Sequence, residues 1–121
     1  MNNSGGALRI AACMGLLGVG LGAFGAHALK GHFEENGHEA IWETAVLYHL
    51  LHAIVLLVLA LAPLDLRKGA YWCFVSGIVI FSGSLYLLAV TGATAFGALT
   101  PFGGGLLLAG WLIIGLKARH L

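Results

Sequence analysis

Charged residues are scarce in this sequence. Its 121 residues include six lysines or arginines and five aspartates or glutamates, which is 9% of the chain. An ordinary soluble domain is about a quarter charged, so this imbalance indicates lipid rather than water as the main solvent. The basic residues are also scattered and the net charge is only +1, which excludes a nucleic-acid-binding surface.

Signatures of metal sites and of catalysis are missing as well. The two cysteines, Cys13 and Cys73, have neither pairing nor metal-ligand spacing, so free thiols are expected. The apolar runs contain no carboxylate, and no HExxH motif or nucleophile elbow is present. A pair such as Ser84 with His52 would therefore lack the carboxylate that orients a catalytic histidine. The sequence favours a protein that is not an enzyme, with no cofactor and no bound metal.

Four long apolar runs make up most of the chain. They cover residues 8–26, 45–62, 70–90 and 101–116, and each approaches the roughly 17 to 25 residues that cross hydrocarbon as a helix. The turns LDLRKG (64–69) and TGATAFGALTP (91–101) are short, so neighbouring helices should be antiparallel. The prediction is one all-α membrane domain over residues 1–121, an antiparallel bundle of four helices.

Basic residues are divided unequally between the two ends of these helices. One end has only Lys30, and the other has five basic residues: Arg9, Arg67, Lys68, Lys117 and Arg119. The positive-inside rule assigns the richer end, with both termini, to the cytoplasm. The first run could alternatively be a signal peptide, since Arg9 lies at its start and the sequence AHA (26–28) at its end.

The connection over residues 29–43 is the only long polar segment. Asn36-Gly37 is a signal for a helix end or turn, so a short interfacial helix is expected before it. The apolar residues of this external segment can lie against lipid headgroups while its carboxylates face water.

Small residues recur at helical spacing within the spans. Four glycines of the first span are spaced by 3, 4 and 3 residues, and the third span adds two more. A smooth face of this kind lets another helix approach closely, although it could also line a substrate path. The expected helix-packing residues are Gly15, Gly18, Gly22, Gly25, Gly77 and Gly83.

The stretch LYHLLHAI (47–54) places two histidines inside the second span. Thr44, Tyr48 and His52 recur at four-residue steps and His49 lies three residues before His52, so these polar groups share one helix face. At 1.5 Å per residue, His52 lies roughly 13 Å from Glu43, near the middle of a ~30 Å hydrocarbon layer. An imidazole at that depth needs a partner or a hydrated cavity.

Partners for these histidines are expected in the outer half of the bundle, where all four spans offer polar groups. The inner half has almost none beyond Cys13, Cys73 and Ser76. The candidate polar cluster, either structural or ligand-binding, consists of His27, Thr44, Tyr48, His49, His52, Ser84, Tyr86 and Thr100.

Three interpretations of this cluster remain open. It can be a network of interhelical hydrogen bonds that sets helix register, in a protein that acts through helix or partner packing. It can belong to a small oligomeric transporter or proton relay, because ionisable groups within a membrane often serve that purpose. It can bind haem or a metal through His27, His49 and His52, although no carboxylate is available at that depth. Beyond the lipid bilayer, a second copy or another membrane protein is the expected partner.

Four segments resemble a known family: LGAFGAHALK (21–30), WETAVLYHLLHAI (42–54), SGSLYLL (82–88) and LTPFGGGLLLAGW (99–111). Together they are similar to the YgdD/YwdK-like family of small four-helix bacterial inner-membrane proteins, a domain of unknown function. The resemblance implies a multi-pass protein of the bacterial cytoplasmic membrane without an established activity. Members often have an amide at the position of His49, which weakens a ligand pair of His49 and His52.

Overall fold

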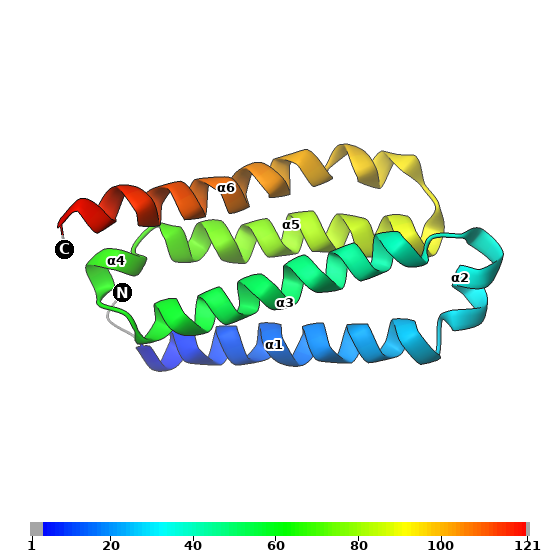
Figure 1. Cartoon of the computed structure of the whole chain (residues 1–121), viewed down its shortest axis with the longest axis horizontal. Helices are drawn as coiled ribbons and strands as arrows, with labels where there is room; N and C mark the ends of the chain where they lie inside the picture. Colours follow the sequence, from blue (N-terminus) through cyan, green and yellow to red (C-terminus); the bar gives the residue numbers. More distant parts are fainter. Residues whose placement is uncertain (1–3, 121) are drawn as a thin grey trace.

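The computed structural model describes residues 4–120, and its elements are helices joined by short turns (Figure 1). Four of the helices are long and apolar enough to cross a membrane, which confirms the predicted fold. In chain order the elements are α1 (Ser4–His27), α2 (Lys30–Asn36), α3 (Glu39–Leu61), α4 (Leu64–Arg67), α5 (Ala70–Thr91), η1 (Thr94–Ala98), α6 (Thr100–Lys117) and η2 (Ala118–His120).

The helices extend beyond the apolar runs that predict them. The largest difference is at α3, which begins at Glu39 rather than near residue 45. The reason is that backbone hydrogen bonding continues into the polar connection, whereas the prediction follows apolar side chains alone. The two turns also contain short helices, α4 and η1, where only connecting loops were expected.

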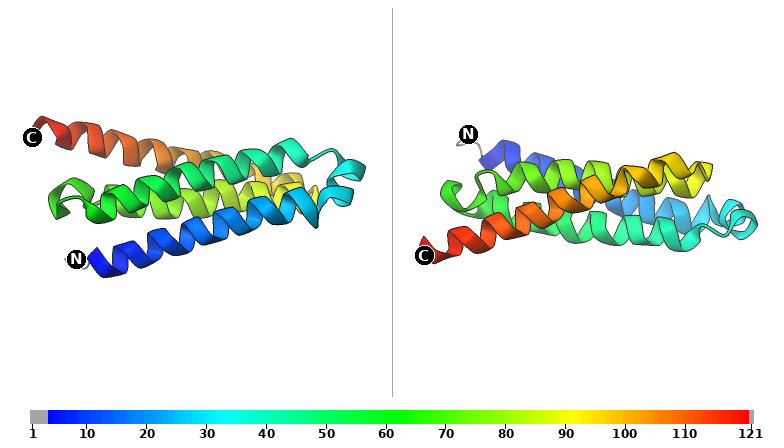
Figure 2. Two further views of the ribbon diagram at one scale, coloured as in Figure 1. Left: turned by 60° about the horizontal axis from the view of Figure 1, so that its bottom comes forward. Right: turned by 90° about the horizontal axis from the view of Figure 1, so that it is seen from above.

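The four long helices pack in the order α1, α3, α5 and α6, and consecutive long helices are antiparallel (Figures 1 and 2). Accordingly α3 and α5 form the centre, while α1 packs mainly on α3 and α6 mainly on α5. The first and last described residues lie at one end, which we call the terminal end. The opposite end carries α2 and is called the α2 end.

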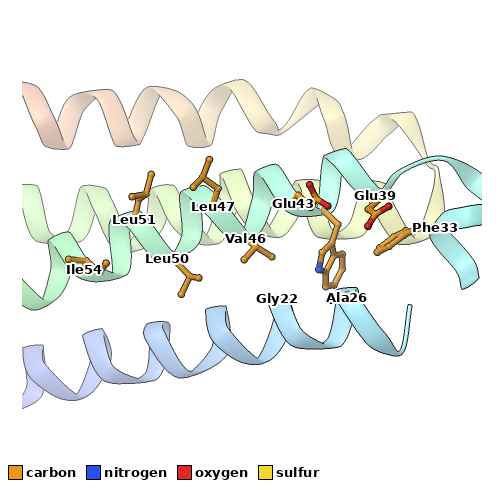
Figure 3. A pocket seen from close by; sticks show the side chains of 12 residues that line it. Gly22, Ala26, Phe33, Glu39, Glu43, Val46, Leu47, Leu50, Leu51 and Ile54 are labelled. Carbon is orange, nitrogen blue, oxygen red and sulfur yellow. The ribbon is translucent and has the colours of Figure 1, made fainter. Parts of the chain in front are cut away.

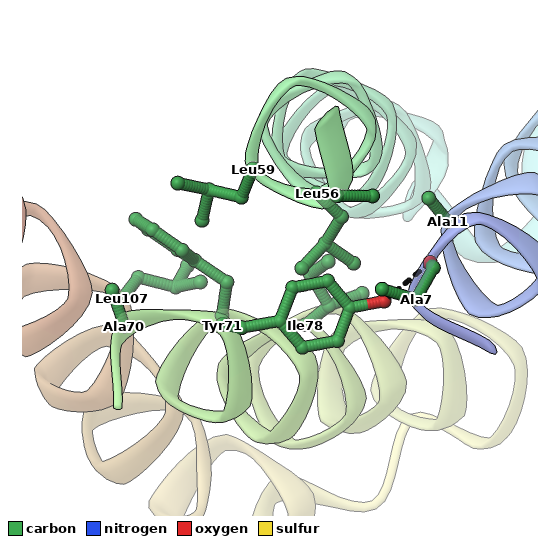
Figure 4. Close-up of a cluster of buried hydrophobic side chains, with 10 residues drawn as sticks. Ala7, Ala11, Leu56, Leu59, Ala70, Tyr71, Ile78 and Leu107 are labelled. Carbon is green, nitrogen blue, oxygen red and sulfur yellow. Dashed lines mark hydrogen bonds between the residues drawn. The ribbon is translucent and has the colours of Figure 1, made fainter. Parts of the chain in front are cut away.

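The main apolar core lies in the half of the bundle nearer the terminal end (Figure 4). Leu56 of α3 and Phe74 of α5 are fully buried in it. The small side chains of Ala7 and Ala11 let α1 pack closely against this core. Because lipid tails are as apolar as leucine, such contacts stabilise a membrane bundle through dispersion and close packing rather than through escape from water.

The short helix α2 is tied to the end of α5 by polar side chains. Asn36 Nδ2 donates to the Ala89 carbonyl at 3.1 Å, and His32 Nε2 lies 2.8 Å from the Val90 carbonyl. These carbonyls are among the last of α5 and lack partners within the helix. Gly37 ends α2 with φ of 73°, a left-handed conformation that suits glycine. The expected short helix before Asn36-Gly37 is therefore confirmed.

Glycine contacts account for the close approach of neighbouring helices at several points. On α1, a Cβ at Gly25 would overlap the Trp42 indole, and Cβ atoms at Gly18 and Gly22 would meet other side chains of α3. On α5, a Cβ at Gly77 would lie 2.6 Å from the Leu107 side chain.

Two glycines of the predicted packing set do not pack within the chain. A Cβ at Gly15 or at Gly83 would meet no described atom within 4 Å. For Gly15 the reason is that α1 packs mainly on a single long helix, so only one side of it is covered. Gly83 borders an open apolar cavity between α5, η1 and α6.

Candidate functional site

The polar side chains of the spans form separate pairs in the structure. His49 of α3 is buried, and its Nδ1 lies 2.9 Å from the Tyr86 hydroxyl of α5. Its other nitrogen, Nε2, is buried and has no hydrogen-bond partner among residues 4–120. His49 therefore has one satisfied nitrogen and one that is not.

His52 uses both ring nitrogens, and its contacts define its tautomer. Trp111 of α6 donates its indole N–H to His52 Nε2 at 3.1 Å. An indole nitrogen can only donate, so Nε2 is an acceptor without a proton. The proton is then on Nδ1, which donates to the Tyr48 carbonyl at 2.8 Å. His52 is thus a neutral imidazole that joins α3 to α6, and a second proton on it would break the bond to Trp111.

Serine and threonine hydroxyls make two further links between helices. Ser82 Oγ donates to the Ala45 carbonyl at 2.8 Å and joins α5 to α3. Ser84 Oγ lies 2.6 Å from Thr100 Oγ1 and joins α5 to the start of α6. Ser84 also donates to the Phe81 carbonyl at 2.9 Å, so the proton between the two hydroxyls comes from Thr100. Both serines are buried, where an unpaired hydroxyl would be costly.

Three members of the predicted cluster lie outside these pairs. His27 is exposed at the end of α1, and Thr44 is exposed and bonds to the Ala40 carbonyl of its own helix. The side chain of Tyr48 is 39% exposed and rests against the Phe81 ring, with 4.7 Å between the ring centroids. The shared inward face predicted for α3 therefore divides, with His49 and His52 buried and Thr44 and Tyr48 at its edge.

The structure does not assemble His27, His49 and His52 into one set of ligands. Over the described part of the chain, no group of three or more histidines, cysteines or carboxylates could hold a metal ion. The reason is topological, because His27 ends α1 on an exposed surface while the other two side chains point toward α5 and α6.

Two tryptophans form hydrogen bonds between helices that the sequence analysis did not predict. Trp42 is buried and donates its indole N–H to the Leu21 carbonyl of α1 at 2.9 Å, although tryptophan rings are typical of the membrane interface. Trp111 lies about 16 Å along α6 from Thr100, although tryptophan prefers the membrane boundary. That unusual depth was a usable signal for a hydrogen bond from Trp111 into the bundle.

The half of the bundle nearer the terminal end is more polar than predicted. Tyr71 of α5 donates its hydroxyl proton to the Ala7 carbonyl of α1 at 2.6 Å, the dashed line in Figure 4. Arg67 is also buried, with only 5% of its surface exposed. The prediction counted Tyr71 as part of an apolar run and Arg67 as one of the basic residues that set the orientation. It missed the hydrogen bond of Tyr71 and the burial of Arg67 because side-chain direction at a helix end does not follow from spacing.

An apolar groove of about 360 Å³ runs between α1 and α3 (Figure 3). It extends from Glu39 and Glu43 near the α2 end to Ile54 in the middle of α3, with Phe33 of α2 at its end. Apolar side chains such as Leu47, Leu51 and Ile54 remain at least half exposed along α3. In a membrane this surface is open to lipid tails or to another apolar helix.

Four apolar antiparallel helices with polar side chains bonded between them define a small multi-pass membrane protein. Comparison with known families agrees: residues 21–104 match the family described as "Protein of unknown function (DUF423)", and the chain belongs to this family. This finding also confirms the resemblance seen in the sequence.

Curated relatives carry the same description of a membrane protein. The UPF0382 membrane protein YwdK of Bacillus subtilis is 44% identical over 108 residues, which cover 85% of this chain and 87% of that protein. The UPF0382 membrane protein SERP0230 of Staphylococcus epidermidis is 43% identical over 102 residues, or 82% of this chain and 83% of the relative. No solved structure matches the chain.

Proposed function

We propose that this chain is a non-enzymatic protein of the bacterial cytoplasmic membrane that acts through association of its helices with lipid and with a partner helix. The observation that carries the proposal is the internal pairing of the polar groups in the spans. His52 bonds to Trp111, Ser82 to Ala45 and Ser84 to Thr100, and each bond joins two helices. Pairs of this kind hold helices in register, which is a structural role.

The outer helices offer the surfaces for such association. Leu16 and Val19 of α1 are 76% and 63% exposed, and Leu108 and Leu112 of α6 are 72% and 62% exposed. Gly15 adds a position on α1 without a side chain, where an added Cβ would meet no described atom within 4 Å. A second copy of the chain or another membrane protein can therefore pack closely on α1, with lipid covering the remainder.

The proposed orientation has both termini in the cytoplasm. The terminal end carries Arg67, Lys68 and Lys117, whereas Lys30 lies in α2 at the opposite end. This distribution supports the orientation through the positive-inside rule.

The structural role is tested by replacing His52 with alanine in the purified full chain. The substitution removes the bonds to Trp111 and Tyr48, so we expect the free energy of unfolding to fall by about 1 kcal/mol. The same preparation in proteoliposomes should carry no proton flux above protein-free vesicles, measured with an internal pH-sensitive dye. Flux in the wild-type protein that disappears in His52→Ala, without loss of stability, would contradict the proposal.

A proton relay in a small oligomeric transporter is a second candidate, favoured by one observation. His49 Nε2 is buried without a hydrogen-bond partner in the described chain, so it is free to accept or release a proton. The test is His49→Gln, because an amide can still bond to Tyr86 but cannot carry the proton. Flux that is lost in His49→Gln at unchanged stability would favour this candidate, and equal absence of flux in both proteins would eliminate it.

A further inference from the structure

Arg67 is a buried cation at the terminal end of the bundle. Its exposed fraction is 5%, and within residues 4–120 it forms no ion pair with a carboxylate. The nearest acidic residue along the chain, Asp65, is exposed, and its backbone carbonyl accepts a hydrogen bond from Lys117. A buried charge without a counter-charge is strongly destabilising, so this arginine requires an anion or an equivalent dipole.

The end of α3 supplies only part of this compensation. Arg67 Nη1 donates to the Ala60 carbonyl at 2.8 Å and lies 3.4 Å from Ser4 Oγ. Ala60 is in the last turn of α3, where the helix dipole amounts to roughly half a negative charge. Both bonds use Nη1, and a guanidinium has further donors on Nε and Nη2. The half charge of the helix end does not balance the full charge of the guanidinium, so an anion beside it would stabilise Arg67 further.

A cavity of about 70 Å³ lies beside Arg67. Lys68, Gly69, Tyr71 and Trp72 line it together with Arg67. Beside it, α5 begins at Ala70 without a side-chain cap, so its first backbone N–H groups have no partner within the helix. A helix N-terminus carries roughly half a positive charge and favours anions. The buried guanidinium and the uncapped helix thus face the same small space.

We propose that this cavity binds the phosphate group of an anionic phospholipid of the phosphatidylglycerol type. Phosphate oxygens match the planar donors of a guanidinium and the amides of a helix start, and the Lys68 ammonium adds a second cation. The position favours a lipid as the source, because Trp72 is 54% exposed beside the cavity and such rings lie at headgroup level. The cytoplasmic leaflet as the origin of this lipid rests on the orientation given under the proposed function.

The experiment uses the full chain in a non-ionic detergent. Native mass spectrometry measures binding of phosphatidylglycerol and of phosphatidylcholine, and calorimetry measures binding of inorganic phosphate. Arg67→Gln should weaken phosphatidylglycerol binding roughly tenfold or more, because charge-assisted hydrogen bonds are lost. Lys68→Gln should weaken it roughly fivefold, as expected for one basic residue near a membrane surface. Arg119→Gln, an exposed control at the same end and outside the cavity, should bind as the wild type does.

Each outcome decides the proposal. Tighter binding of phosphatidylglycerol than of phosphatidylcholine, lost in the two cavity variants, supports it. Equal binding by the wild type, Arg67→Gln and Lys68→Gln overturns it, and inorganic phosphate binding without a lipid preference overturns the lipid source. If Arg67→Gln does not fold, Lys68→Gln decides alone, because its side chain is exposed and makes no hydrogen bond in the described chain. Proton flux and the unfolding free energy of His52→Ala do not depend on this cavity. A failure of the lipid-binding proposal therefore leaves the proposed function intact.

Discussion

Replacing Gly103 by alanine should destabilise the bundle, because its helix backbone touches that of a neighbour. Gly103 is buried near the start of α6, where it lies against Phe81 of α5. An added Cβ would lie 2.6 Å from Phe81 Cα and would overlap the Phe81 backbone nitrogen. Backbone atoms of a packed helix cannot rotate away as a side-chain end can, so α5 and α6 would have to separate.

Gly105 is a matched control two residues further along α6. It is exposed, and a Cβ there would meet no described atom within 4 Å. Alanine in a helix is favoured over glycine by roughly 0.5 to 1 kcal/mol, whereas forcing a methyl group into a packed contact costs about 1 to 3 kcal/mol. Gly103→Ala should therefore lower the free energy of unfolding by about 1 to 2 kcal/mol, and Gly105→Ala should raise it by about 0.5 kcal/mol.

The assay is reversible unfolding of the purified chain in mixed micelles with increasing dodecyl sulfate, followed by circular dichroism. The midpoint should move to lower dodecyl sulfate for Gly103→Ala and to higher dodecyl sulfate for Gly105→Ala. The described contact between α5 and α6 would be refuted if Gly103→Ala unfolded at the wild-type midpoint or above it.

Three further predictions test other parts of the molecule. Trp111→Phe keeps the ring but removes the N–H donor to His52, so unfolding midpoints should report a loss of about 0.6 kcal/mol. The double variant with His52→Ala should lose less than the sum of the two single losses, and strict additivity would argue against the bond. Asn36→Ala removes the hydrogen bond that ties the end of α2 to the Ala89 carbonyl, so α2 amides should exchange hydrogen faster by mass spectrometry while α1 amides are unaffected. A fluorescent reporter that matures only in the cytoplasm should be bright when fused after the C-terminus. A dark fusion would contradict the proposed orientation.

His49 and His52 show why the polar face of α3 could be predicted from the sequence but the partners of its side chains could not. Spacing along α3 placed His49 and His52 on one face, and both are buried. Depth does not define the partner, because helices offer several side chains at the same level. His49 meets Tyr86, as a depth argument allows, whereas His52 meets Trp111, a residue outside the predicted cluster.

Apolar length by itself determined the number of spans, their helical state and their antiparallel order. These features follow from local chemistry, since a backbone in hydrocarbon must bond to itself and a short turn reverses direction. Asn36-Gly37 likewise marked the end of α2, because a left-handed residue is a local property.

Only the tertiary structure decided which helices touch and which polar groups meet. The order α1, α3, α5, α6 leaves Gly15 uncovered and places Gly103 against Phe81, although both glycines look alike in the sequence. The same arrangement buries Arg67 beside the uncapped start of α5. Rotation about a helix axis and the choice of neighbour depend on contacts between distant segments, and the spacing of residues within one segment does not contain that information.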